Sequence, residues 1–158
     1  MKGIKLVVIG AGSTYTPELI EGLIKRRELL KIGEIALMDI DENKLSIVGG
    51  LAVRMIRAAG LDWNVTFHKD YKCVKGASYV MTQIRVGKLA ARILDEKIPL
   101  EYGMIGQETC GIGGFFKALR TIPVLFEIAD MIKELSPDAY MINFTNPSGI
   151  IAEALKYK

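Results

Sequence analysis

Short apolar runs that end in glycine or acidic residues alternate along this chain with longer amphipathic stretches, and this alternation constrains the fold most. Strands are expected at residues 4–10, 34–40, 63–68, 77–84 and 138–144. Helices are expected at residues 17–30, 42–60, 115–135 and 147–158, with a further helical piece near 90–96. Strands that alternate with helices form parallel sheets whose crossovers cover both faces.

The sequence therefore predicts a doubly wound, mostly parallel, Rossmann-like α/β domain over residues 1–158. The expected strand order is 3-2-1-4-5, with helices on both faces of the sheet. Ligands of such sheets bind beyond the carboxyl ends of the strands, at the switch point between the first and fourth strands.

The segment "VVIGAGSTYTPEL" places Gly10 and Gly12 between the first strand and the first helix. A dinucleotide pyrophosphate binds there to backbone N–H groups at a helix N-terminus. Tyr15 stands where the full fingerprint has a third glycine, so a tight turn without a ligand is the alternative. The hydroxyls of Ser13 and Thr14 favour a phosphate, and Thr16 before Pro17 is expected to cap the helix.

Asp39 ends the second strand, where a carboxylate accepts both ribose hydroxyls of an adenosine. A solvated acid at a strand end is the alternative. Ile40 and Asp41 follow in place of an arginine, and two acidic residues would repel a 2′-phosphate. Gly10, Gly12, Ser13, Thr14 and Asp39 therefore predict a cofactor site for NAD rather than NADP.

Charge and composition point to no nucleic acid and no membrane. The 21 Lys and Arg residues nearly balance 18 Asp and Glu residues, and the basic cluster at 25–27 is followed by Glu28 on an expected helix. No apolar run approaches the ~20 residues that span a bilayer. Cys73 and Cys110 lie far apart and in no CxxC pair, which is typical of reduced thiols in a cytoplasmic protein.

Three stretches carry a more specific signal: "GSTYTPELIEGLIKR", "TQIRVGKLAARILDEKIPLEYGMIGQETCGIGGFFKALRTIPV" and "MINFTNPSGI". Together they resemble the NAD-dependent glycoside hydrolase family four, and within it most the 6-phospho-β-glucosidases. The family is an exception to ordinary two-carboxylate glycoside hydrolysis. The resemblance implies NAD, a divalent metal such as manganese, and a phosphorylated disaccharide or aryl glucoside as substrate. It also implies a homo-oligomeric full-length protein.

The resemblance implies a reaction without net oxidation. The sugar is oxidised at C3, a base removes the acidified C2 proton, the aglycone leaves C1, water adds, and C3 is reduced again. A ketone beside C2 stabilises a carbanion, and a metal on the oxygens stabilises the enolate.

Residue by residue, Arg92 matches an arginine that contacts the phosphorylated sugar, with Arg85 as a second candidate. The alternative for Arg92 is a helix-surface pair with Asp95 or Glu96. Glu108, in "GQETCGIGG", matches an acidic position that tunes the catalytic base, or else it caps the helix near residue 113.

Asn143 is expected to face the nicotinamide ribose, and Asn146 matches a substrate-contacting asparagine. An amide suits both tasks because it offers a donor and an acceptor on one planar group. The alternative for Asn146 is a turn residue that caps the helix beginning at Pro147.

The family's metal-binding cysteine and histidine, its acid and its tyrosine base all come later in the family pattern, so no metal ligand is expected in this chain. His68 matches no ligand position, and Cys110 is expected to be a partly buried loop thiol. The chain thus resembles the NAD-binding part alone and is expected to be inactive by itself. A 2-hydroxy-acid dehydrogenase of the lactate/malate type and a non-catalytic NAD-binding module remain alternatives.

Overall fold

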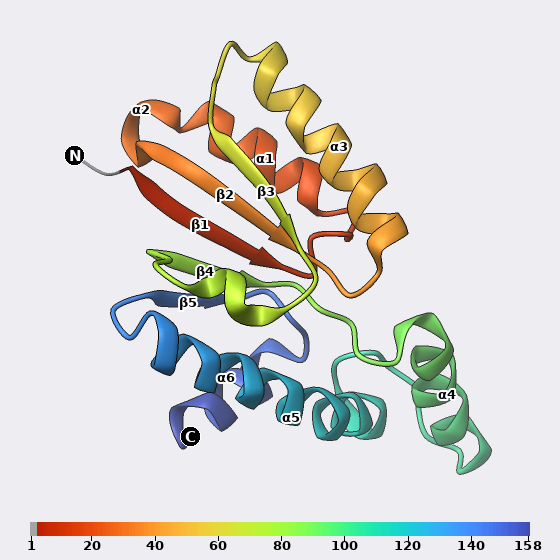
Figure 1. Ribbon diagram of the computed structural model, residues 1–158. Helices are drawn as coiled ribbons and strands as arrows, with labels where there is room; N and C mark the ends of the chain where they lie inside the picture. The colour runs from red at the N-terminus through yellow and green to blue at the C-terminus, as the bar shows by residue number, and fades with distance from the viewer. Residues whose placement is uncertain (1–2) are drawn as a thin grey trace. The chain divides into compact units, whose positions relative to one another are not determined.

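A five-stranded sheet organises the protein, whose computed structural model describes residues 3–158 (Figure 1). The strand order is β3-β2-β1-β4-β5, as the sequence predicts. Strand β1 runs parallel to β2 and β4, and β2 runs parallel to β3. The strands are β1 (Ile4–Ile9), β2 (Ile32–Met38), β3 (Asn64–His68), β4 (Tyr79–Thr82) and β5 (Tyr140–Asn143).

Six α-helices and one 3-10 turn connect or follow the strands within residues 3–158. They are α1 (Thr16–Lys25), α2 (Arg27–Leu30), α3 (Glu42–Ala58), η1 (Tyr71–Val74), α4 (Lys88–Glu101), α5 (Gly111–Leu135) and α6 (Ser148–Lys156). None of these helices is both long and apolar enough to cross a membrane.

The described chain forms two compact units. The first runs to Gln83 and also contains residues 131–142, and the second contains residues 84–130 and 143–158. The first unit holds η1, the helices α1, α2 and α3, and the strands except for Asn143 at the end of β5. The second unit holds α4, most of α5, and α6.

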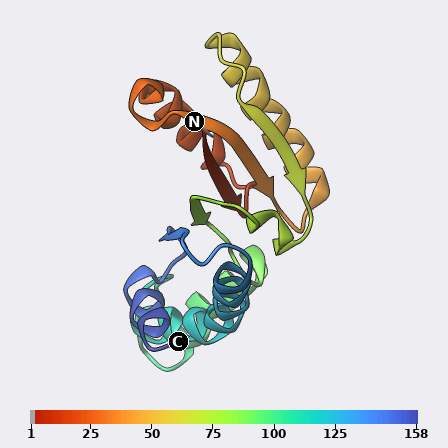
Figure 2. The same ribbon diagram turned by 60° about the vertical axis from the view of Figure 1, so that its left-hand side comes forward.

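The core of the first unit lies between the strands and the two helices α1 and α3, which run side by side along β1, β2 and β3 (Figures 1 and 2). Alternate residues of a strand point to the same face, so Leu6 and Val8 pack with Ile35 and Leu37 against the helices. Ile20 of α1 is fully buried in the same cluster. From α3, Leu45, Ala52 and Ile56 complete it. Burial of these side chains holds the carboxyl ends of β1 and β2 together.

Some expected boundaries are wrong. The single helix expected at 17–30 is two helices, α1 and α2, which meet at Arg26. Strand β2 begins at Ile32, two residues earlier than expected, because Lys31 in a left-handed conformation (φ 42°) already ends α2. The short helical piece expected near 90–96 extends over the whole of α4.

The sequence predicts that Thr16 caps α1, and this prediction is wrong. The N-cap residue is Tyr15, and no side chain makes the capping hydrogen bond. The Thr16 side chain is instead fully buried and its hydroxyl donates to the carbonyl oxygen of Ala11 at 2.8 Å. A buried hydroxyl needs a partner, and the preceding loop supplies one.

Candidate functional site

The glycine loop after β1 is tied to the end of β2. Gly10 has a φ of 89°, a left-handed conformation that favours glycine. The backbone N–H groups of Gly10 and Ala11 both donate to the carbonyl oxygen of Met38 at 2.9 Å. The loop thus turns over the carboxyl end of the neighbouring strand, at the edge of the sheet where ligands of such folds bind.

Gln83, which directly follows β4, fastens the same loop from the other side. Its side-chain amide donates to the hydroxyl of Thr16 at 2.7 Å and to the carbonyl oxygen of Gly10 at 3.2 Å. Sequence reasoning missed this residue. In the sequence, the one indication was the position of this amide directly after an apolar strand. The neighbouring residues do not show which groups it hydrogen-bonds.

Asp39 lies directly after β2, as predicted, and its carboxylate closes the turn. The backbone N–H of Gly12 donates to Oδ2 and that of Asp41 donates to Oδ1, each at 2.8 Å. A Cβ atom on Gly12 would stand 2.8 Å from Oδ2, so this contact requires glycine. An ionised carboxylate offers about four lone-pair positions, so acceptor capacity remains on Asp39 for further donors.

Of the predicted cofactor residues in this unit, the structure brings Gly10, Gly12 and Asp39 together. The Ser13 hydroxyl accepts from the backbone N–H of Tyr15 at 3.2 Å, a local contact that shapes the start of α1. Thr14 is exposed.

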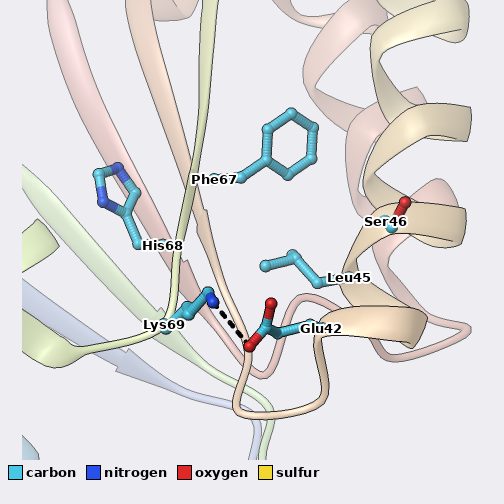
Figure 3. A pocket seen from close by; sticks show the side chains of 6 residues that line it. All are labelled: Glu42, Leu45, Ser46, Phe67, His68 and Lys69. Carbon is cyan, nitrogen blue, oxygen red and sulfur yellow. Dashed lines mark ion pairs between the residues drawn. The ribbon is translucent and has the colours of Figure 1, made fainter.

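A hollow of about 250 Å³ lies where α3 begins and β3 ends (Figure 3). Lys69 and Glu42 form an ion pair of 2.7 Å across its rim. His68 uses Nε2 in a 2.9 Å hydrogen bond with the Thr66 hydroxyl. The residues that line the hollow are Glu42, Leu45, Ser46, Phe67, His68 and Lys69.

In the second unit, Glu108 gathers three basic side chains from different elements. Its Oε1 accepts from Arg85 Nη1 and from Lys117 Nζ, each at 2.6 Å. Its Oε2 lies 3.0 Å from Arg92 Nη1. We call Arg85, Arg92, Glu108 and Lys117 the Glu108 cluster. The sequence predicted three of its members, whereas Lys117, set in an apolar helix, was missed.

Arg92 also contacts Glu96 at 2.7 Å, so the expected surface pair forms together with the contact to Glu108. The contact with Glu96 raises the pKa of Arg92 above its ordinary value. The carboxylate oxygens of Glu108 contact side chains of three other segments, and its alternative role as a helix cap stays a prediction.

Two opposing influences act on the pKa of Glu108. Partial burial raises it, because a carboxylate loses hydration. Hydrogen bonding and charge attraction from Lys117, and then from Arg85, lower it, and the net result is a pKa below the ordinary value. The carboxyl group is therefore ionised at neutral pH. Three cations of the cluster surround it, and Glu96, outside the cluster, offsets part of the charge on Arg92.

A partly buried ion pair joins α4 to α5 in the same unit as the Glu108 cluster. Arg120 holds the carboxylate of Asp95 with two hydrogen bonds, 2.6 Å from Nη2 and 3.1 Å from Nη1. The Asp95 residue is only 4% exposed. Arg120 Nε also donates to the carbonyl oxygen of Val86 at 3.0 Å, which fastens the segment that carries Arg85. The paired Asp95 raises the pKa of Arg120.

Three of the four glycines of "GQETCGIGG" serve close packing within the unit. A Cβ on Gly106 would collide with the carbonyl oxygen of Glu96 in α4. A Cβ on Gly113 would lie 2.8 Å from the carbonyl oxygen of Asp95, and one on Gly114 would lie 2.5 Å from the backbone of Thr109. At these three positions the protein's own backbone occupies the space that a Cβ atom would need.

The segment from Asn143 to Asn146 is anchored through the buried Thr145. The Thr145 hydroxyl accepts from the backbone N–H of Ile84 at 3.0 Å, beside Arg85. The Asn143 amide bonds both the N–H and the C=O of Thr145, at 3.1 and 2.9 Å. Asn146 is exposed and precedes a cis bond to Pro147. The expected cap by Asn146 is wrong, because Pro147 is the N-cap residue of α6 and no side chain makes the capping bond.

Within residues 3–158, no three His, Cys, Asp or Glu side chains lie close enough together to hold a metal ion. Cys73 and Cys110 are free. Burial raises the pKa of Cys73 to about 11. Cys110 is exposed, not partly buried as expected, because its loop lies at the surface before α5.

The sequence model of the family 4 glycosyl hydrolases matches residues 5–158. The chain belongs to glycosyl hydrolase family 4. A probable 6-phospho-β-glucosidase of Bacillus subtilis (strain 168) is 56% identical over 157 residues, which make up 98% of this chain and 36% of that protein.

Solved structures of family 4 proteins share the fold closely. A 6-phospho-β-glucosidase from Thermotoga maritima, solved with manganese, NAD+ and glucose-6-phosphate, is 43% identical with a TM-score of 0.91. The match covers 97% of this chain and 37% of that one. A 6-phospho-α-glucosidase from gut microorganisms, solved with NAD and glucose-6-phosphate, is 35% identical with a TM-score of 0.94 over 99% of this chain and 37% of that one.

The chain therefore spans about a third of the length of the family 4 proteins that it matches. A lactate dehydrogenase from Eimeria maxima is 17% identical with a TM-score of 0.66 over 99% of this chain and 40% of that one, a likeness of fold alone.

The ion pair between Asp95 and Arg120 leads to a stability prediction. Arg120→Met leaves a buried carboxylate without its counter-ion and should lower the free energy of unfolding by about 3 kcal/mol, measured by urea denaturation. Lys97→Met, at an exposed position of the same helix as Asp95, should change it by less than about 0.5 kcal/mol. Equal, small losses in both variants would contradict the role assigned to the pair.

Proposed function

We propose that residues 1–158 form the NAD-binding domain of a glycosidase that hydrolyses 6-phospho-β-glucosides. The observation that carries the proposal is the contact between Gly12 and Asp39, which sets a carboxylate beside the glycine loop. Identity of 56% with the probable 6-phospho-β-glucosidase of Bacillus subtilis, against 39% with a maltose-6′-phosphate glucosidase of that organism, favours the β-glucosides.

The glycine loop suits the pyrophosphate of NAD, and Asp39 suits the adenosine ribose. Gly10 and Gly12 keep the turn free of side chains at the start of α1, where N–H groups attract phosphate. Asp39 keeps acceptor positions free after its two backbone contacts, so ribose hydroxyls can donate to it. Asp39 and Asp41 both disfavour a 2′-phosphate, so NAD is preferred over NADP. Ser13 and Thr14 complete the phosphate site with hydroxyl donors.

The Glu108 cluster suits a phosphorylated sugar. Arg85 and Arg92 are each more than a third exposed and present guanidinium groups, whose forked donors match phosphate oxygens. The three cations of the cluster outnumber the carboxylates of Glu108 and the neighbouring Glu96, so a positive charge remains for an anion. Glu108 then tunes the base that takes the C2 proton, Asn146 contacts the sugar, and Asn143 contacts the nicotinamide ribose.

The reaction that follows is oxidation at C3, loss of the C2 proton and elimination at C1, with water addition and reduction at the end. Bound NAD would supply the hydride acceptor for the first step and the donor for the last. A divalent metal such as manganese belongs to the full-length enzyme in this proposal, and no residue of this chain is assigned to it. The full-length protein would be a homo-oligomer in the cytoplasm, where free thiols such as Cys73 and Cys110 stay reduced.

The cofactor assignment predicts the effect of one substitution. Asp39→Asn replaces the charged carboxylate that accepts hydrogen bonds from the ribose hydroxyls with a neutral amide. It should weaken NAD binding at least about tenfold, measured by calorimetry. Asp62→Ala is the matched control, because Asp62 is exposed and precedes β3, at the opposite end of the strands. Unchanged NAD affinity in a folded Asp39→Asn variant would refute the assignment.

The phosphosugar assignment predicts discrimination between a sugar and its phosphate. With NAD present, the chain should bind glucose 6-phosphate at least about tenfold more tightly than glucose in calorimetry. Arg92→Met should remove most of this difference, while Lys97→Met on the same helix should keep it. An equal response to both sugars in the wild-type chain would count against the Glu108 cluster as the phosphate site.

The chain by itself should not turn over substrate. Incubated with NAD, manganese and a chromogenic 6-phospho-β-glucoside, it should release no chromophore, because the described residues gather no metal-binding cluster. The full-length Bacillus subtilis relative serves as the positive control. Chromophore release by the chain would contradict the prediction that the chain alone is inactive.

Two other outcomes would bear on the alternative functions. NADH formation from lactate or malate would favour a 2-hydroxy-acid dehydrogenase. NAD binding without any reaction is also what a non-catalytic NAD-binding module would show.

A further inference from the structure

Lys117 differs from the other two cations of the Glu108 cluster in its burial. Its side chain is 5% exposed, whereas those of Arg85 and Arg92 are 38% and 39% exposed. It extends from α5, and its ammonium group lies 2.6 Å from Glu108 Oε1. The only hydrated members of the cluster are thus the two arginines and, in part, Glu108 itself, whose side chain is 21% exposed.

Burial makes the contact between Lys117 and Glu108 obligatory. A buried ammonium group that lost its carboxylate would have neither water nor a counter-ion, which costs far more than the loss of an exposed pair. The exposed guanidinium groups of Arg85 and Arg92 can exchange a carboxylate for another anion or for water at little cost. The cluster therefore contains one fixed ion pair and two exchangeable ones.

We propose that Lys117 is a positioning residue that holds Glu108 in place and ionised, so that Arg85 and Arg92 are free to contact an anionic sugar without loss of the Glu108 carboxylate. This inference rests on the proposed function for its purpose, because it matters only if an anionic ligand reaches the two arginines. The fixed pair itself is a property of the second unit and is testable without cofactor or sugar.

The charged groups that face Glu108 come from three segments. Arg85 follows β4, Arg92 and its partner Glu96 lie on α4, and Lys117 lies on α5. Burial raises the pKa of Glu108, and Lys117 is the strongest influence that lowers it. The folded-state pKa is depressed, so the stabilisation from Glu108 is present above its unfolded-state value, about 4.3, and is lost as the pH falls through the folded-state value.

The test is a carbon-13 NMR titration of the Glu108 carboxyl group in the 158-residue chain, without NAD or sugar. Lys117→Met should move the titration midpoint upward, because the desolvation remains while the buried cation is gone. Lys117→Arg should restore a depressed midpoint, and Lys133→Met, at an exposed position of the same helix, should leave it unchanged. An unchanged midpoint in a folded Lys117→Met variant would overturn the proposal.

If Lys117→Met does not fold, a nitrogen-15 NMR titration of the wild-type chain still tests the proposal. The nitrogen-15 resonance of the Lys117 ammonium group should shift at the pH where Glu108 titrates, and Glu108→Gln should abolish this shift. A Lys117 resonance that ignores the titration of Glu108 would overturn the proposal. Neither measurement involves NAD or a sugar, so failure of the proposed function would appear in the binding experiments and not here.

Discussion

The ion pair between the buried Asp95 and the half-buried Arg120 is the constraint on which the Glu108 cluster depends. It joins α4 to α5 and, through Val86, fastens the segment that carries Arg85. Arg92 lies on the same helix as Asp95, and its guanidinium group contacts Glu96 and Glu108. A bidentate contact suits this task because it fixes both the distance and the orientation of the two helices.

Two carboxylates, one in each compact unit, are held in different ways. Backbone N–H groups hold Asp39, so its position follows from the glycine loop and its remaining lone pairs stay available to ligand hydroxyls. Charged side chains hold Glu108, so its surroundings keep a surplus of positive charge. The first arrangement suits a ribose and the second suits a phosphate, which is consistent with a dinucleotide and a phosphorylated sugar as ligands.

Much of this was readable from the sequence because it depends on local pattern. The alternation of strands and helices predicted the strand order, and the position of Asp39 after β2 followed from the end of an apolar run. Arg92 and Glu108 came from resemblance to a family motif, and Arg85 from its place near the end of the fourth strand. Thr16 was misread as a helix cap, because a hydroxyl before proline looks the same whether it bonds its own helix or the preceding loop.

Residues whose role depends on a distant partner could not be predicted. Gln83 bonds Thr16 and Gly10, which lie 67 and 73 positions away, and Arg120 bonds Asp95 across 25 positions. By itself, the sequence determined which residues follow the strands, because the side-chain periods of strands and helices are local properties of the chain. Only the tertiary structure decided which of the basic residues is buried on Glu108, because the burial of Lys117 arises from packing between segments far apart in the chain.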